Sequence, residues 1–232
     1  MKNKSAIILC AGFGKRMLPL TKRTPKPLIK VNGITLLENT INFLILIGIK
    51  NIIINSYHLH KKISLFLKSK KFNAKIKLVI EKKEILDTGG GILNASTLLN
   101  KSGFIVINPD TIWSKRYIND FKKLDSFYFR KKKPVMLLVS KRKSYDKSFK
   151  GDFNINSKQE IKRDQKNEFI FTGAQILNRS IFDGRKIKPF SMNLVWNSLI
   201  KKKHLFGIRS KNKFYHLNSL KILKKMRNDL MI

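Results

Sequence analysis

The alternation of short apolar runs with segments of helical periodicity constrains the fold of this chain more than any other feature. Apolar runs of strand length recur through the first 140 of its 232 residues, at 6–11, 51–57, 74–81, 104–108 and 134–140. Between them, the spacing of apolar residues predicts helices at 36–48, 59–67, 90–99 and 116–127. Strands that alternate with helices predict βαβ units, and therefore an α/β fold with a doubly wound, mostly parallel mixed sheet flanked by helices.

The second part of the chain follows a looser pattern. Residues 141–150 are polar and basic, which predicts a loop. Further strands are expected at 151–155 and 169–177, as an antiparallel addition to the sheet, and at 205–209 between helices at 191–201 and 219–230. No internal repeat or low-complexity linker interrupts the chain, so we expect one domain over 1–232 with two halves, 1–140 and 141–232.

The chain is strongly basic, with 50 Lys and Arg against 14 Asp and Glu and a net charge of +36. Such a balance is typical of proteins that bind nucleic acid. However, 40 of the basic residues are Lys and only 10 are Arg, whereas nucleic-acid sites favour the planar fork of Arg. We therefore expect a basic surface that reflects composition, and no specific nucleic-acid partner.

Cysteine content and hydropathy exclude several classes of protein. A single Cys excludes a disulfide scaffold and a multi-cysteine zinc site. No apolar run approaches the 18 residues of a transmembrane helix, and the run at 6–11 is too short for a secretory signal. We expect a cytoplasmic protein without a membrane partner.

A glycine-containing basic loop follows the first predicted strand, and ligands of open α/β sheets bind at the carboxyl ends of strands. Gly12 and Gly14 allow backbone N–H groups to approach a ligand closely, and basic residues and prolines follow as far as Leu28. The spacing excludes a Walker A loop, and Met17 stands where the dinucleotide fingerprint needs a third glycine. A rigid, basic loop of this kind favours a polyphosphate ligand.

The whole segment closely resembles the signature of the sugar-1-phosphate nucleotidyltransferases, the enzymes that make an NDP-sugar and pyrophosphate from an NTP and a sugar-1-phosphate. The resemblance rests on Ala11-Gly12-x-Gly14-x-Arg16-Met17-x-Pro19-Leu20-Thr21 and Pro25-Lys26-Pro27-Leu28. It continues in Glu81-x-x-Glu84-x-Leu86-x-Thr88-Gly89-Gly90-Gly91, Asn108-x-Asp110, Gly151-Asp152-Phe153, Phe171-Thr172-Gly173 and Phe190-Ser191-Met192-Asn193-x-x-Trp196. Within the family, these segments look most like the branch that includes the N-acetylmuramic acid α-1-phosphate uridylyltransferases.

The resemblance implies a fold and a division of the chain. The fold would be Rossmann-like, of the GT-A-like nucleotidyltransferase type. Residues 1–140 would form the nucleotide-binding half and residues 141–232 the sugar-binding half.

The resemblance also implies a role for each matching residue. Arg16, Lys26 and Asp110 would be catalytic. The nucleotide would meet Ala11, Gly12, Gly14, Thr88 and Gly89, and the sugar and its phosphate would meet Glu81, Asp152 and Asn193. The reaction is an in-line attack on the α-phosphorus by an oxygen that is already anionic, so catalysis needs positioning and charge neutralisation more than a strong base.

One departure from the family pattern concerns the metal. Asp110 matches a metal-binding aspartate and would hold Mg²⁺, with Mn²⁺ as an alternative. Many family members carry a second metal aspartate late in the chain, and here His216 stands at that position, with Asn218 in place of the following glycine. His216 is therefore a candidate metal ligand, although imidazole suits Mg²⁺ less well than carboxylate does.

The sequence thus predicts a nucleotidyltransferase that takes an NTP, with UTP favoured, and a sugar-1-phosphate such as N-acetylmuramate 1-phosphate. A mannose-1-phosphate guanylyltransferase or a cytidylyltransferase of the same family is the enzymatic alternative. A nucleotide-binding module with weakened catalysis, or a basic nucleic-acid-binding module, is the non-enzymatic one. The sequence does not determine the oligomeric state.

Overall fold

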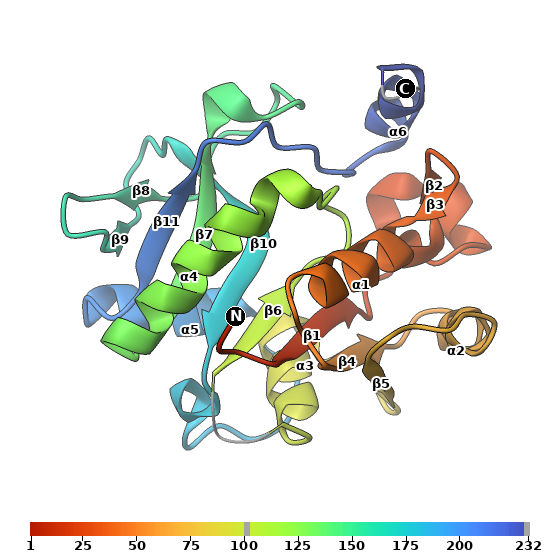
Figure 1. Ribbon diagram of the computed structural model, residues 1–232, viewed down its shortest axis with the longest axis horizontal. Coiled ribbons are helices and arrows are strands. Elements are labelled where there is room, and N and C mark those ends of the chain that lie inside the picture. The colour runs from red at the N-terminus through yellow and green to blue at the C-terminus, as the bar shows by residue number, and fades with distance from the viewer. Residues whose placement is uncertain (100–102, 230–232) are drawn as a thin grey trace.

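The computed structural model describes residues 1–99 and 103–229, and it is built around one large mixed sheet (Figure 1). Within those residues the sheet has seven strands. From one edge to the other they are β11 (Phe206–Ser210), β7 (Val135–Ser140), β10 (Phe169–Leu177), β6 (Phe104–Ile107), β1 (Ser5–Cys10), β4 (Asn51–Ser56) and β5 (Lys75–Ile80).

All neighbouring strands run parallel except at β10, which is antiparallel to β6 and to β7. The predicted mostly parallel mixed sheet is therefore confirmed. The antiparallel strand is not a marginal addition, because it lies between β6 and β7 and joins β6, β1, β4 and β5 to β7 and β11. The pairing of β10 with β7 shifts register between Phe171 and Gln175, and Gly173 within this stretch accepts a hydrogen bond from Asn108 N just after β6.

Helices cover both faces of the sheet, as a doubly wound fold requires (Figure 1). On one face, α1 (Leu36–Leu46) and α4 (Ile118–Lys131) bury Ile41, Leu44 and Phe121 against alternate residues of the strands. On the other face, α3 (Asp87–Ser96) and α5 (Met192–Lys201) bury Ile92 and Val195 against the intervening residues. Buried strands with apolar residues on both faces explain the continuous apolar runs of the sequence.

The remaining helices and hairpins lie around the sheet. Helix α2 (His60–Lys68) follows β4, and α6 (Leu220–Asp229) packs on the hairpin of β2 (Lys30–Val31) and β3 (Ile34–Thr35). A second hairpin, β8 (Asn154–Ile155) with β9 (Ile161–Lys162), lies along β11 and bridges to it through Glu160 and Phe206.

Most predicted boundaries differ from the observed ones by a few residues. The largest differences are of three or four residues: α3 begins at Asp87, before the glycines that usually end helices, α4 ends at Lys131, and the strand expected at 151–155 is only Asn154–Ile155. Residue 230, the predicted end of the last helix, lies outside the described residues. The predicted loop at 141–150 contains one short 3₁₀ turn, Lys141–Lys143, and otherwise no regular structure.

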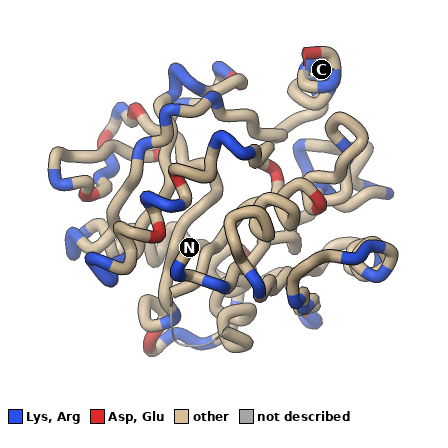
Figure 2. Tube along the Cα trace, viewed as in Figure 1, with Lys and Arg blue, Asp and Glu red and all other residues tan. Residues whose placement is uncertain are grey.

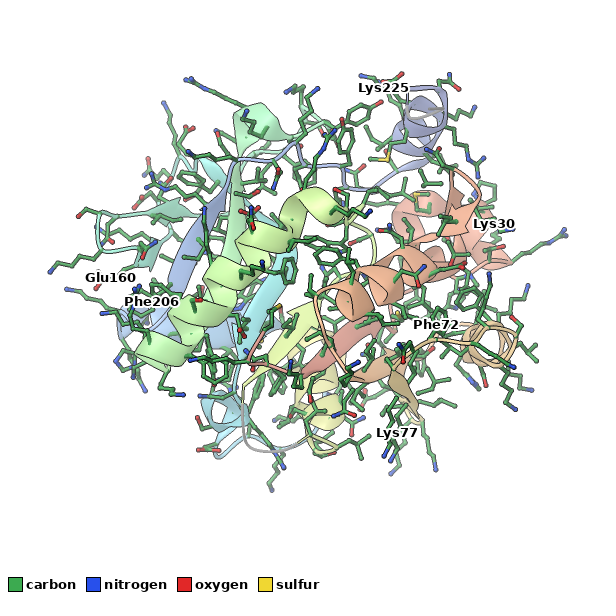
Figure 3. The ribbon with its side chains drawn as sticks, in the orientation of Figure 1. Lys30, Phe72, Lys77, Glu160, Phe206 and Lys225 are labelled. Carbon is green, nitrogen blue, oxygen red and sulfur yellow. The ribbon has the colours of Figure 1, made fainter. Side chains whose placement is uncertain are left out.

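The basic side chains are distributed around the molecule. Figure 2 shows Lys and Arg along nearly every segment of the trace, with few acidic residues between them. Lys30 and Lys77, both exposed, lie at the outer edge of the molecule (Figure 3). Across the described ranges, no helix is both long and apolar enough to cross a membrane.

Candidate active site

The glycine loop after β1 is held in a fixed shape by contacts within its own segment. Gly14 has a φ of 65°, and a Cβ at this position would lie 2.9 Å from Cγ2 of Thr21. Its carbonyl accepts hydrogen bonds from Met17 N at 2.8 Å and from Thr21 Oγ1 at 3.1 Å. Three short 3₁₀ turns follow, at Lys15–Met17, Leu20–Lys22 and Lys26–Leu28. Only glycine meets both the backbone and the space requirement at residue 14.

Gly12 differs from Gly14, because no atom of the described structure lies within 4 Å of the place its Cβ would occupy. Its backbone is also outside the left-handed region. Neither packing nor conformation therefore requires glycine at residue 12. An open face over a glycine backbone leaves room for a ligand to approach the N–H groups.

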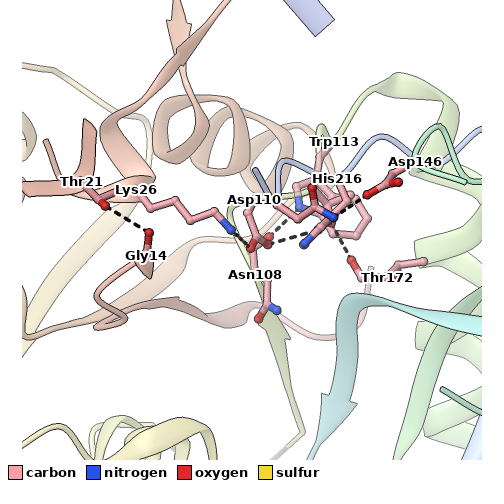
Figure 4. Close-up of polar contacts among 11 residues, drawn as sticks. Gly14, Thr21, Lys26, Asn108, Asp110, Trp113, Asp146, Thr172 and His216 are labelled. Atoms are coloured by element: carbon pink, nitrogen blue, oxygen red, sulfur yellow. Dashed lines mark hydrogen bonds and ion pairs between the residues drawn. The ribbon is translucent and has the colours of Figure 1, made fainter. Parts of the chain in front are cut away.

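Lys26 and Asp110 form an ion pair at the centre of the site (Figure 4). Lys26 lies between Pro25 and Pro27, both buried, and its Nζ is 2.5 Å from Oδ2 of Asp110, which follows strand β6. Both side chains are about one-sixth exposed, at 16% and 17%. The two prolines hold the backbone of Lys26, so the ammonium is presented from a stiff segment.

The environment of Asp110 favours its ionised form. Burial by itself would raise the pKa of this carboxyl, but the opposing effects of His216 and Lys26 lower it to about 2. Oδ2 receives the hydrogen bond from Lys26, whereas Oδ1 is buried and accepts no hydrogen bond from any described residue. Asp110 is thus a carboxylate at neutral pH with one oxygen still lacking a donor.

His216 lies beside Asp110, with its Nδ1 3.6 Å from Oδ1 of that carboxylate and 3.5 Å from Oγ1 of Thr111 (Figure 4). Its ring stacks on Phe214 and meets the edge of Phe149. Burial lowers the pKa of His216, Asp110 opposes that effect, and the charge of Lys26 lowers it again. Burial thus disfavours the charged imidazole, and Lys26 forms the ion pair with Asp110.

These groups line a cavity of about 410 Å³ at the carboxyl ends of the parallel strands. It brings together seven of the predicted residues: Ala11, Gly12, Gly14, Arg16, Lys26, Thr88 and Asp110. The basic loop forms one end, and Ile85, Asp87 and Thr88 lie at the start of α3. The predicted catalytic residues and all predicted nucleotide-binding residues except Gly89 thus share one cavity, while the role of each residue stays a prediction.

Two predicted residues of the α3 region lie outside the lining. A Cβ on Gly89 would lie 2.3 Å from Cε2 of Phe190, so close packing of α3 against the segment before α5 accounts for this glycine. Glu81 is buried, and its carboxylate accepts from Asn55 Nδ2 at 2.7 Å and Leu86 N at 2.8 Å. Its burial raises its pKa. Glu81 supports the turn into α3, and nothing in the described contacts turns it toward the cavity.

The two predicted sugar-binding residues of the second half, Asp152 and Asn193, also lie outside the lining. Both are exposed, and Arg163 lies near them. Its guanidinium donates to Oδ1 of Asn193 at 2.6 Å and of Asn197 at 2.5 Å, and lies 4.7 Å from the ring centre of Phe153. Arg163 was not singled out from the sequence, because only the fold brings this residue, which follows β9, to Asn193 and Asn197 of α5.

Among the described residues of the second half, Asn218 is the one that lines this cavity. The sequence indicated Asn218 only as a departure from a family glycine. Its Nδ2 donates to Oδ2 of Asp146 at 2.6 Å, and Asp146 lies in the segment 141–150 that follows β7. Hydrogen bonds from Leu217 N to Asp110 O and from Ile112 N to Tyr215 O place the segment beside the end of β6.

The residues present fit a divalent cation held partly by substrate. Asp110 supplies a buried carboxylate oxygen without a donor, the kind of ligand that Mg²⁺ and Mn²⁺ prefer. Within the described parts of the chain, no group of three or more His, Cys, Asp or Glu could hold an ion alone. An ion here would therefore complete its shell with substrate phosphates and water, which is how Mg²⁺ commonly binds at phosphate sites.

Comparison with known proteins identifies the relatives of this chain. A family model described as nucleotidyl transferase matches residues 5–186. The N-acetylmuramate alpha-1-phosphate uridylyltransferase of Caulobacter vibrioides is 24% identical over 92% of this chain and 91% of its own length. That of Neisseria meningitidis serogroup B is 30% identical over 77% of each chain. For some other relatives the chain covers less of their length, 51% and 26% in two cases.

A solved structure with the same fold is HddC from Yersinia pseudotuberculosis complexed with GMP-PN. It is 23% identical to this chain and superposes with a TM-score of 0.78 over 98% of this chain and 99% of its own. This likeness confirms the fold, and the family match covers well over half of the chain. The chain therefore belongs to the nucleotidyl transferase family, as an enzyme of nucleotide-sugar biosynthesis.

Proposed function

We propose that this enzyme transfers uridylyl from UTP to N-acetylmuramate 1-phosphate and releases pyrophosphate. The observation that carries the proposal is the cavity in which Gly12, Arg16, Lys26 and Asp110 converge. Two uridylyltransferases with this acceptor in their names match 92% and 77% of the chain, which supports the choice of base and sugar.

The chemistry requires an acceptor oxygen to attack the α-phosphorus as the bond to pyrophosphate breaks. The oxygen–phosphorus bond of the new diphosphate forms, and pyrophosphate leaves with the electron pair of the broken bond. The nucleophile is already an anion, so no residue has to remove a proton. The transition state instead concentrates negative charge on phosphate oxygens, and preorganised positive groups stabilise it most.

Each group in the cavity then has a defined task. The backbone N–H groups around Gly12 and Gly14 would bind the triphosphate, and Arg16 would bind its outer phosphates. Lys26 would neutralise charge where the α-phosphate meets the acceptor phosphate. A divalent cation beside Asp110 would offset the remaining phosphate charge. When phosphates are absent, Asp110 holds the Lys26 ammonium in place at 2.5 Å.

The acceptor side of the proposal is assigned to the second half. We propose residues 1–140 as the nucleotide-binding half and residues 141–232 as the sugar-binding half of one domain over 1–232. Asp152 and Asn193, together with Arg163, which donates to Asn193, are the proposed sugar-side residues of the second half, and Glu81 is the proposed sugar-side residue of the first half. Because the substrates are nucleotides and phosphosugars of metabolism, we propose that the enzyme acts in the cytoplasm.

A substrate panel tests the proposal. Each of UTP, GTP, CTP and dTTP is combined with N-acetylmuramate 1-phosphate and with mannose 1-phosphate, in Mg²⁺ and in Mn²⁺, and pyrophosphate release is measured. The proposal predicts the highest kcat/KM for UTP with N-acetylmuramate 1-phosphate. Higher efficiency with GTP or CTP would move the assignment to the guanylyl- or cytidylyltransferase alternative. Nucleotide binding without pyrophosphate from any pair would favour the binding module.

A further inference from the structure

Two oxygen atoms of residues that line the cavity lack a hydrogen-bond donor. They are Oδ1 of Asp110 and Oδ1 of Asn218, and both are buried atoms to which no described residue donates. A buried polar atom without a partner carries a desolvation penalty, so each one calls for an explanation. Both belong to residues that line the same cavity, and oxygen atoms of this kind bind hard cations.

The Asn218 amide is oriented by the loop after β7. Its Nδ2 donates to Oδ2 of Asp146 at 2.6 Å, so Oδ1 is directed away from that carboxylate. Asp146 is itself held by Ser148, whose N and Oγ both donate to its Oδ1, at 2.9 and 2.7 Å. Asp146 accepts from three donors, so the amide cannot reverse without placing two acceptor oxygens together.

The backbone brings Asn218 to Asp110 without bringing His216 into the cavity. Leu217 N donates to Asp110 O at 2.7 Å, and a β-bridge joins Thr111 to His216. Residues 216 and 218 flank that hydrogen bond. Asn218 is among the described residues that line the cavity, whereas His216 is not, and its ring lies between Phe149 and Phe214.

We propose that Asn218, rather than His216, is the second protein ligand of the divalent cation at Asp110, through its amide oxygen. Asp146 is the positioning residue that aims this oxygen. The chain thereby replaces the family's second carboxylate with a neutral oxygen two residues further along. This inference rests on the proposed function only for the presence of a cation, and it is tested without turnover.

The first test titrates the whole chain and its variants with Mn²⁺ alone, and measures free Mn²⁺ by electron paramagnetic resonance. Asn218→Ala should weaken Mn²⁺ binding by about 10- to 100-fold, as Asp110→Asn should. Asp146→Ala should weaken it about 10-fold, and Asp146→Asn, whose amide oxygen still accepts from Nδ2, should restore it. His216→Phe, which keeps the ring packing, should leave the affinity within a few-fold of wild type, since it removes no ligand.

The second test examines the bound Mn²⁺ directly. Protein labelled with ¹⁵N-histidine should show no electron spin-echo modulation from a coordinated imidazole nitrogen. A strong ¹⁵N-histidine coupling, or wild-type affinity in a folded Asn218→Ala variant, would overturn the inference. If Asp110→Asn leaves Mn²⁺ binding unchanged, the inference is overturned as well, because the cation is then not at this site.

These outcomes separate the inference from the proposed function. Pyrophosphate release that depends on Asp110, together with an Asn218→Ala variant of normal Mn²⁺ affinity, would refute the ligand assignment alone. Mn²⁺ binding that depends on Asp110 and Asn218, without pyrophosphate release from any substrate pair, would refute the proposed activity alone. Thermal unfolding of each variant shows whether a lost signal comes from a lost fold.

Discussion

Two segments beside Asp110 are held in place by different means. Residues 12–28 are called the first wall here, and residues 214–218 the second wall. The basic loop at 12–28 is shaped by contacts within itself, such as the hydrogen bonds to the Gly14 carbonyl and the prolines around Lys26. The segment at 214–218 is held from outside, by backbone hydrogen bonds to Lys143, Ile112 and Asp110. The first wall contributes the basic side chains of Arg16 and Lys26 to the cavity, whereas the second contributes the amide of Asn218.

This difference separates two parts of the chemistry. Charge neutralisation at phosphate needs groups at fixed positions, and a locally rigid loop provides them. Cation binding tolerates several kinds of oxygen ligand, so the second wall can change its residues as long as one oxygen reaches the cavity. Variants of the first wall should therefore reduce catalysis most, and variants of the second wall should act mainly on the metal.

The largest effect is expected for Lys26→Ala. Loss of a preorganised positive group at the transferred phosphate should lower kcat by about 10²–10³-fold, measured as pyrophosphate release. Lys22→Ala is the matched control, because this exposed lysine lies in the same loop outside the cavity. Equal losses in the two variants would mean that the loop contributes only its overall charge.

A smaller effect on activity is expected for Gly12→Ala. Since there is open space at this Cβ position, the variant should unfold at the wild-type temperature. A methyl group on the ligand face should still raise the KM for UTP, by about 10-fold, which corresponds to about 1.4 kcal/mol. A KM that does not change would show that the nucleotide does not approach this backbone.

Gly14→Ala, unlike Gly12→Ala, should lower the stability of the fold. Its positive φ and the 2.9 Å approach to Thr21 make the substitution strained, so we expect a loss of about 1–3 kcal/mol in the free energy of unfolding. Denaturant titration measures this loss. Wild-type stability of the Gly14→Ala variant would contradict the account of the loop as locally constrained.

Arg163→Ala should act on the acceptor side alone. Loss of its hydrogen bonds to Asn193 and Asn197 should raise the KM for the sugar-1-phosphate a few-fold, because an exposed hydrogen bond contributes about 0.5–1.5 kcal/mol. The KM for UTP should stay the same. A change in the UTP KM instead would remove this cluster from the proposed sugar side.

The smallest effect is expected at Thr111, which joins the second wall to β10. Its Oγ1 donates to Thr172 O at 2.7 Å, and Thr111→Val should cost about 1 kcal/mol of the free energy of unfolding. Activity should change little. A loss of activity as large as that of Lys26→Ala would mean that the two walls do not differ as described.

The sequence predicted the first wall well because its information is local. Apolar runs with the strand period placed β1, β4, β5, β6 and β7 within a few residues, and the loop motif brought Gly12, Arg16 and Lys26 to one cavity. The family match supports the identity of the enzyme. Asp110 was predicted because Asn108-x-Asp110 matches the metal-binding aspartate of the family that the sequence resembles.

The second wall was predicted less well because non-local contacts determine it. Asn218 reaches the cavity through a bridge between residues about 100 apart in the chain, and Asp146 orients it from a loop expected only to be basic. Likewise, the close approach of Gly89 to Phe190 is a non-local packing contact that the sequence did not indicate, and the predicted nucleotide contact of Gly89 stays a prediction. Single-sequence patterns carry little information about such pairings.

The most direct test of the central claim is a single-turnover reaction of UTP with N-acetylmuramate 1-phosphate, followed by ³¹P nuclear magnetic resonance. The account predicts equal amounts of a UDP-sugar and pyrophosphate from the wild-type enzyme, with the rate falling in Lys26→Ala and unchanged in Lys22→Ala. Bound UTP that persists without a new diphosphate signal, under conditions where the fold is intact, would contradict it.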